Sequence, residues 1–215
     1  NPCILQYTTT DGEILHFNDN AFDEKIISHA YTNKGIVIFE KPIVCIDSTA
    51  FYKKERLLSI IIPDSVTEIG GSAFFGCSGL TSVTIPNSVT KIGCSAFKNC
   101  RDLTNITIPN SVTEIRDWAF EGCTGLTSVH ISNLSTWCKI SFGNFWANPL
   151  YYAQKLYLNN KLIEGDLAIP DSTTSIGCCA FYGCSGLTNI TIPDNVTEIG
   201  EKAFSGCTGL ASVTI

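Results

Sequence analysis

Basic residues are scarce in this chain of 215 residues, which has 14 Lys and Arg against 20 Asp and Glu. Nucleic-acid binding needs a clustered excess of positive charge, so the formal net charge of −6 argues against it. No apolar run approaches the roughly 18 residues of a membrane-spanning helix, so direct membrane insertion is not expected. The chain has no methionine and begins with Asn1 and Pro2, so we expect a processed chain from which a signal peptide has been removed.

The sequence also lacks the usual arrangements of catalytic and metal-binding residues. His16, His29 and His130 have no spacing that ties them to a nucleophile or a carboxylate, so no catalytic triad is predicted. Zinc ligands usually occur as close pairs such as Cys-x-x-Cys, and no such pair is present. No privileged pair of acids stands out for glycoside hydrolysis. We therefore expect no enzyme activity, no metal and no cofactor.

A repeat dominates the sequence instead. The phrase Ile-Pro-x-Ser-Val-Thr begins at Ile62, Ile85 and Ile108 and returns in altered form at Ile169 and Ile192, which gives a period of 23 residues. Such self-similarity is typical of a solenoid, in which each coil covers the apolar face of its neighbour. The regular units are 40–62, 63–85, 86–108, 109–131, 170–192 and 193–215. The unit 132–169 is longer by 15 residues.

Each regular unit ends in a strand-like phrase, exemplified by Leu80, Val83 and Ile85. Apolar and polar residues alternate there as a half-buried strand requires, so stacked units predict a parallel sheet. The proline that follows lacks an N–H, and we expect it to end the hydrogen-bonded ladder. A turn position in three units holds Glu68, Glu114 and Glu198, which we expect to form a solvated stripe rather than an acidic contact patch.

Three further positions recur in the alignment. One predicts an aromatic spine in the interior: Phe51, Phe74, Phe97, Phe120, Phe181 and Phe204. A second predicts a left-handed backbone, because glycine and asparagine tolerate positive φ: Gly76, Asn99, Gly122, Gly183 and Gly206. A third predicts buried thiols that pack as small apolar groups: Cys77, Cys100, Cys123, Cys184 and Cys207.

Disulfides remain an alternative for some of the 11 cysteines. Cys94 with Cys100, or Cys178 or Cys179 with Cys184, could close small loops. An odd number leaves at least one thiol unpaired if all pairing is internal, so mostly reduced cysteines are favoured. Four Asn-x-Ser/Thr sequons are attributed to the repeat composition rather than to glycan attachment: Asn105, Asn133, Asn189 and Asn195.

These motifs resemble the BspA-like leucine-rich repeat family. The consensus of that family is similar to the phrase Ile-Pro-x-Ser-Val-Thr-x-Ile-Gly-x-x-Ala-Phe-x-Gly-Cys-x-Gly-Leu-Thr-x-Val-Thr, which recurs over roughly residues 40–215. The resemblance implies a leucine-rich-repeat solenoid: a β-rich right-handed superhelix with a parallel sheet on one face and little helix. Residues 1–39 are similar to the segment that precedes the repeats in some relatives, and we expect them to cap the first repeat. The solenoid then covers 40–215, with regular repeats over 40–131 and 170–215.

The outer face of the sheet is one candidate surface for a partner. Alternation along the strands turns hydroxyl, amide and imidazole side chains outward at Ser82, Thr84, Asn105, Thr107, Ser128, His130, Asn189 and Thr191. The alternative is that Ser and Thr serve β-propensity and solubility there, and that His130 is a surface variant.

The expanded unit 132–169 is a second candidate, because it concentrates the aromatic residues Trp137, Phe142, Phe145, Trp146, Tyr151, Tyr152 and Tyr157. A helical turn or two is expected over 133–141, and a hairpin around Asn159 and Asn160 over 155–163. The aromatic residues either seal the enlarged coil against its neighbours or bind a partner, since aromatic anchors dominate interfaces. Trp137, Trp146 and Tyr151 are the candidate partner-binding residues.

The sequence therefore predicts a non-catalytic interaction or adhesion module that is secreted or displayed at the cell surface. The family resemblance implies host, matrix or cell-surface proteins as partners, and a glycan remains open. The alternative is a structural spacer or assembly segment of a larger surface protein. Because the chain stops at the end of a predicted strand, we expect either further repeats or self-association through that edge.

Overall fold

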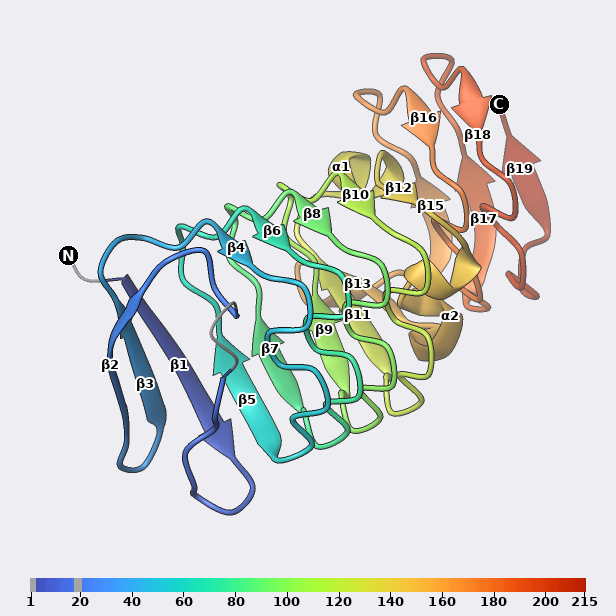
Figure 1. Ribbon diagram of the computed structural model, residues 1–215. Helices are drawn as coiled ribbons and strands as arrows, with labels where there is room; N and C mark the ends of the chain where they lie inside the picture. The colour runs from blue at the N-terminus through green and yellow to red at the C-terminus, as the bar shows by residue number, and fades with distance from the viewer. Residues whose placement is uncertain (1–2, 18–20) are drawn as a thin grey trace.

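The computed structural model describes residues 3–17 and 21–215 and is a solenoid with two rows of parallel strands and little helix (Figure 1). This confirms the predicted fold class. The longer strands form one row: β5 (Leu57–Ile61), β7 (Ser82–Thr84), β9 (Asn105–Thr107), β11 (Ser128–Ile131), β13 (Leu156–Leu158), β15 (Gly165–Ala168), β17 (Leu187–Thr191) and β19 (Ser212–Thr214). The second row consists of two-residue strands: β4 (Cys45–Ile46), β6 (Glu68–Ile69), β8 (Lys91–Ile92), β10 (Glu114–Ile115), β12 (Ser141–Phe142), β16 (Ser175–Ile176) and β18 (Glu198–Ile199).

Equivalent positions of successive coils stand opposite each other, as Ile60 does with Val83 and Ile106 with Val129. The recurring Ile-Pro corner follows β5, β7, β9, β15 and β17, and the carbonyl of Pro86 accepts a hydrogen bond from the N–H of Val89 at 3.1 Å. The strand therefore ends where proline removes the next donor.

The serine of the repeat phrase binds the preceding coil. Its hydroxyl donates to a backbone carbonyl of that coil: Ser65 to Ile43 at 2.6 Å, Ser88 to Val66 at 2.6 Å and Ser111 to Val89 at 2.7 Å. These hydroxyls satisfy carbonyls that no backbone N–H reaches at the corner. The recurrence of serine at this position is therefore explained by stacking between coils.

The N-terminal residues form an antiparallel extension of the longer sheet. It contains β1 (Cys3–Thr9), β2 (Ile26–Tyr31) and β3 (Gly35–Phe39), in the order β2-β3-β1-β5-β7. Phe17 packs edge-on against Phe51 with ring centroids 5.2 Å apart, which covers the first coil of the aromatic spine. Because β1 pairs directly with β5, the sheet is continuous across the proposed boundary at residue 39, and that boundary stays a prediction.

The predicted aromatic spine is confirmed over the regular coils. Neighbouring rings are nearly parallel, with centroids 5.0 Å apart for Phe51 and Phe74, 5.1 Å for Phe74 and Phe97, and 5.3 Å for Phe97 and Phe120. The expanded coil interrupts the spine, which resumes at Phe181 and Phe204 with a centroid distance of 5.3 Å. The interior of the solenoid is thus built around one stacked column.

The cysteine column is buried as predicted, and it also makes specific hydrogen bonds. Each of four thiols donates to the phenylalanine carbonyl of the preceding coil: Cys77 to Phe51, Cys100 to Phe74, Cys123 to Phe97 and Cys207 to Phe181, at Sγ to O distances of 3.0, 3.2, 3.0 and 3.2 Å. All 11 cysteines are free thiols. Burial raises the pKa of Cys77 and Cys123 to about 12, so these thiols stay protonated and keep their donors.

The predicted left-handed position is confirmed by φ values of 69° at Gly76, 62° at Asn99, 75° at Gly122, 71° at Gly183 and 79° at Gly206. A second left-handed position, four residues earlier in each coil, was not predicted. Its φ values are 68° at Thr49, 55° at Ser72, 56° at Ser95, 57° at Trp118, 59° at Cys179 and 57° at Lys202. Residues with a Cβ occupy it throughout, so each coil holds them there against an intrinsic backbone cost.

The expanded coil contains the predicted helical turn and hairpin. Helix α1 (Leu134–Cys138) begins after Asn133, whose side chain accepts a hydrogen bond from the N–H of Thr136. A 3₁₀ turn, η1 (Phe145–Ala147), and the short helix α2 (Leu150–Ala153) follow. Strand β14 (Lys161–Leu162) pairs antiparallel with β13 and separates it from β15, so the longer row of strands is interrupted at this coil. None of the helices among the described residues is long and apolar enough to cross a membrane.

Candidate binding surfaces

The outer face of the longer row carries the predicted polar side chains. Ser82, Thr84, Asn105, Thr107 and Thr191 are exposed, whereas Ser128, His130 and Asn189 are half-buried. The interruption by β14 divides this face into two patches, one over β7, β9, β11 and β13 and one over β15, β17 and β19. The strand face is therefore shorter than a continuous strip along the whole chain.

Within each patch, neighbouring side chains contact one another. The ring of His130 stacks on Tyr157 with centroids 4.8 Å apart, and its Nε2 lies 3.0 Å from the hydroxyl of Ser128. In the second patch, the Asn189 amide donates to Asp166 at 2.5 Å and accepts from the hydroxyl of Ser212 at 2.6 Å. Hydrogen bonds from Asn189 and Thr188 hold the pKa of Asp166 below its usual range. Ser128, His130 and Asn189 are thus already bonded to side chains within this face.

Trp137 does not lie on the surface, which corrects its place among the candidate partner-binding residues. Its side chain is 1% exposed, and the indole Nε1 donates to the carbonyl of Ala180 at 2.8 Å. In regular coils that carbonyl position accepts from the N–H of a spine phenylalanine, as Ala96 accepts from Phe74 at 2.7 Å. The indole supplies the donor that the expanded coil lacks, so the sealing interpretation holds for Trp137.

Five other rings form a group on the turn side of the solenoid, here called the aromatic cluster: Phe145, Trp146, Tyr151, Tyr152 and Tyr182. Each of these side chains is half-buried. Phe145 contacts Trp146 and Tyr151 with centroid distances of 4.0 and 5.6 Å, and Tyr151 contacts Tyr152 and Tyr182 at 5.0 and 5.3 Å. The rings therefore form one connected surface that spans two coils.

Backbone and side-chain contacts hold the aromatic cluster in place. The hydroxyl of Tyr152 accepts a hydrogen bond from the N–H of Gly122 at 2.8 Å, and burial raises the pKa of Tyr152 above its usual value. The Lys202 ammonium lies 5.1 Å from the centroid of the Phe145 ring. The carbonyl of Trp146 accepts from the N–H of Phe120, so the residue joins the coil through its backbone and leaves its indole partly exposed. Rings fixed in this way lose little conformational entropy on binding.

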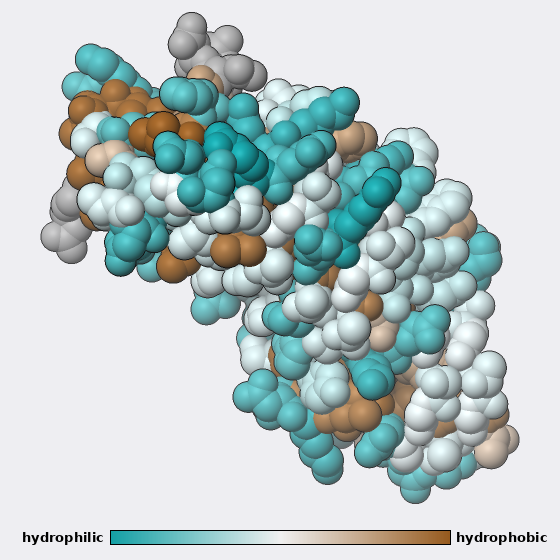
Figure 2. All heavy atoms as spheres, turned by 90° about the horizontal axis from the view of Figure 1, so that it is seen from below, coloured by the Kyte–Doolittle hydropathy of each residue, from teal (hydrophilic) through white to brown (hydrophobic). Residues whose placement is uncertain are grey.

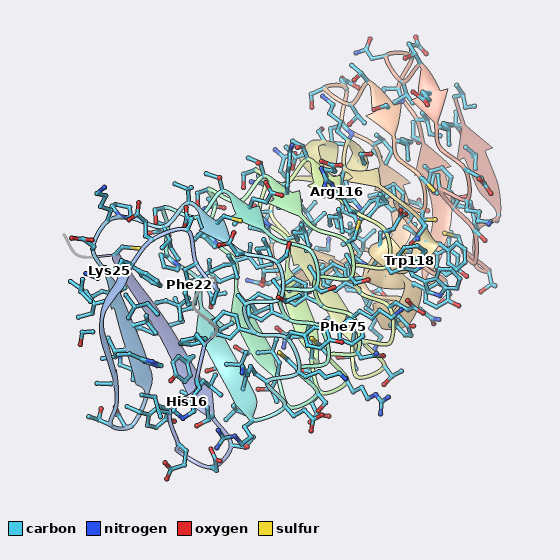
Figure 3. All side chains as sticks on the ribbon, viewed as in Figure 1. His16, Phe22, Lys25, Phe75, Arg116 and Trp118 are labelled. Atoms are coloured by element: carbon cyan, nitrogen blue, oxygen red, sulfur yellow. The ribbon has the colours of Figure 1, made fainter. Side chains whose placement is uncertain are left out.

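Trp118 adds a sixth ring beside the aromatic cluster, and the sequence analysis missed it. Its side chain is 43% exposed, and its backbone N–H donates to the side chain of Asn144, the residue before Phe145. Figure 3 labels Trp118 and Arg116, which lie in the same coil just after β10. The repeat alignment could have identified Trp118, because the equivalent position in two earlier coils holds serine, at Ser72 and Ser95.

Exposed apolar residues also occur at the N-terminal end, where Figure 2 shows hydrophobic atoms gathered around the first strands. The exposed fractions are 58% for Ile27, 52% for Val44 and 51% for Ile61. Single exposed aliphatic side chains are common on folded domains, so these residues do not by themselves mark a site. Within residues 3–17 and 21–215, no group of three or more His, Cys, Asp or Glu side chains is placed to hold a metal ion.

The stacked coils, their two rows of parallel strands and the inward phenylalanine column define a leucine-rich-repeat solenoid. The family model for the BspA type leucine rich repeat region matches residues 44–164 and 152–215 with 6 copies. The chain belongs to this family, which confirms the resemblance found in the sequence. A comparison with curated protein sequences gave no match.

Among solved structures, the chain is similar to the pneumococcal vaccine antigen PcpA, with 22% identity and a TM-score of 0.49, over 80% of this chain and 42% of PcpA. It is also similar to the leucine rich repeat protein TpLRR of T. pallidum, with 24% identity and a TM-score of 0.41, over 80% of this chain and 73% of the other. A leucine rich cell surface protein from Faecalibacterium prausnitzii has 22% identity and a TM-score of 0.33, over 98% of this chain and 76% of the other. The chain thus spans less than half the length of PcpA.

Proposed function

We propose that this chain is a non-catalytic interaction module that binds a protein partner through the aromatic cluster and Trp118. The observation that carries the proposal is the connected set of half-buried rings beside an indole that is 43% exposed. Trp and Tyr are enriched among the residues that supply most of the binding energy in protein interfaces. A secreted or cell-surface location belongs to the same proposal and rests on the resemblance to BspA-like proteins.

The charges around the aromatic cluster favour a protein over a glycan as the partner. The Lys202 ammonium lies 5.1 Å from the centroid of the Phe145 ring and 3.3 Å from the carboxylate of Glu201, so both signs of charge are represented beside the cluster. An apolar or aromatic centre with a polar and charged rim is the usual composition of a protein interface. The strand face is a weaker candidate, because Ser128, His130 and Asn189 already bond to neighbouring side chains of the same face.

The proposal is tested by immobilising the chain and measuring capture of matrix proteins, cell-surface proteins and glycans. Trp146→Ala removes a ring of the cluster but keeps the backbone carbonyl that holds Phe120. Tyr52→Ala is the matched control, since Tyr52 is 40% exposed and stacks on Phe75 in a different part of the same turn side. We expect a protein ligand whose capture is lost with Trp146→Ala and retained with Tyr52→Ala. Equal capture by both variants, capture of glycans alone, or no capture at any concentration would contradict the proposal.

A further inference from the structure

Two adjacent cysteines differ from the thiols of the interior column. The Sγ atoms of Cys178 and Cys179 are 3.5 Å apart, and among the described residues no other pair of thiols is recorded at hydrogen-bonding distance. Cys178 is half-buried and Cys179 is fully buried. The column thiols donate to phenylalanine carbonyls, whereas the side chains of this pair contact each other.

The pair lies in the regular coil 170–192, on the side that contacts the expanded coil. The side-chain amide of Asn148 donates to the carbonyl of Cys179 at 2.5 Å, and the N–H of Cys179 donates to the carbonyl of Glu201 at 3.0 Å. Asn148 directly follows η1, which carries Phe145 and Trp146 of the aromatic cluster. Tyr182, another cluster residue, is three positions after Cys179. A change in the backbone at Cys179 would therefore act on both sides of the aromatic cluster.

We propose that Cys178 and Cys179 form a modification site that exchanges with low-molecular-mass disulfides to give a reversible disulfide between adjacent residues. The thiolate of Cys178, the more accessible residue, attacks the small disulfide, forms a mixed disulfide and releases one small thiolate, which takes up the proton that Cys178 lost. The sulfur of Cys179 then attacks the Sγ of Cys178, and the second small thiol leaves with the proton of Cys179. The small disulfide is reduced to two thiols while the two cysteines are oxidised, so electrons and protons balance.

A disulfide between adjacent residues is strained, and this strain makes the bond reversible rather than a permanent cross-link. Consecutive Cα atoms are about 3.8 Å apart. Disulfides usually join Cα atoms roughly 4.4–6.8 Å apart, and strained bonds are reduced more readily. Burial raises the pKa of Cys179 to about 12, so Cys179 is protonated in the reduced chain. The regulatory consequence rests on the proposed function: turning the Cys179 carbonyl away from Asn148 would loosen the aromatic cluster.

Mass spectrometry of the whole chain after treatment with oxidised glutathione tests the modification itself. Cleavage after Phe181 or Tyr182 separates the pair from Cys184, so fragmentation can assign a bond between Cys178 and Cys179. We expect that bond to form, and to be reversed by reduced glutathione. A stable glutathione adduct on Cys178 without closure, or pairing of Cys178 with any other cysteine, would overturn the proposal.

Two variants sharpen the assignment. Cys179→Ser should stop the reaction at the mixed disulfide on Cys178, whereas Cys94→Ser should leave the reaction unchanged. Cys94 is the suitable control because it is exposed and occupies the position of Cys178 in another coil. Closure that still occurs in Cys179→Ser would contradict the assignment.

Amide hydrogen exchange tests the link to the aromatic cluster without any partner. Oxidation is expected to speed exchange in 145–153 and 179–182 while 60–110 stays unchanged. Unchanged exchange in 145–153 would overturn the regulatory part. Because neither measurement uses a ligand, failure of the modification and failure of the proposed binding function are separate results.

Discussion

The thiol of Cys100 donates a hydrogen bond to the carbonyl of Phe74, one coil earlier, at 3.2 Å. The same carbonyl accepts the N–H of Cys77 at 3.1 Å, so each of its two lone pairs has a donor. This arrangement explains why the position holds cysteine, which combines a small apolar volume with a weak donor. The cysteine column therefore links successive coils by hydrogen bonds and is also part of the core.

Replacing Cys100 with valine keeps an apolar side chain of similar size but removes the donor. We expect Cys100→Val to lower the free energy of unfolding by about 0.5–1.5 kcal/mol, the net value of one hydrogen bond. Urea unfolding measures this change, and Cys94→Val at an exposed position should differ from the parent by less than about 0.5 kcal/mol. Wild-type stability in Cys100→Val would show that the thiol acts only as an apolar group.

Ionisation of the buried thiols should make the chain less stable at alkaline pH. The pKa of Cys77, Cys123 and Cys184 is raised from 9.0 to about 12 in the folded chain. Above pH 9 the unfolded chain releases these protons and the folded chain retains them, so stability falls as pH rises from 9 towards 12. Each thiol contributes a slope of at most about 1.4 kcal/mol per pH unit in that window.

This dependence is tested by measuring the urea concentration at the unfolding midpoint at a series of pH values from about 7 to about 10.5. Cys123→Ser removes one titrating thiol and should give a shallower decline above pH 9 than the parent. A midpoint that is flat across the range, or an identical decline in the variant, would contradict the assignment.

Substitutions in the aromatic spine should lower the free energy of unfolding most at its centre. Phe97 is fully buried between two stacked rings, so Phe97→Ala should cost about 3–5 kcal/mol. Phe204 is only partly buried and has one recorded stacking partner, Phe181, so Phe204→Ala should cost less. Urea unfolding of both variants gives the comparison, and equal losses would show that stacking within the spine is not what stabilises Phe97.

Replacing Trp137 tests its indole donor and its packing together. Trp137→Phe retains an aromatic ring but leaves the carbonyl of Ala180 without its donor, at a cost of about 1–3 kcal/mol. Trp118→Phe is the matched control, because Trp118 is 43% exposed and its indole is open to solvent. A loss in Trp137→Phe no larger than in Trp118→Phe would contradict the role given to the indole.

The regular coils were predictable because every coil repeats the same side-chain environment. Phe97, Gly76 and Cys100 each belong to a position whose residue type recurs, so alignment alone reveals burial or backbone conformation. The left-handed residues at Ser72 and Ser95 gave no such signal, because serine is ordinary in turns and the backbone there is imposed by neighbouring coils.

The expanded coil was less predictable, since it has no sister coil for comparison. Its helical turn and hairpin follow from local signals such as Asn133 and Asn159, and both are confirmed. The burial of Trp137 depends on the distant carbonyl of Ala180, which no local pattern reveals. For the same reason the sequence indicated Trp146 and Tyr151 but not Tyr182, which joins them only in space.

The central claim is that a partner binds the aromatic cluster rather than the strand face, and one pair of dissociation constants tests it. For a captured protein ligand, Tyr151→Ala should raise Kd by about tenfold or more, as expected for an aromatic anchor worth over about 1.4 kcal/mol. Thr107→Ala, an exposed change on β9, should leave Kd unchanged. A large increase with Thr107→Ala and none with Tyr151→Ala would contradict the account and assign binding to the strand face.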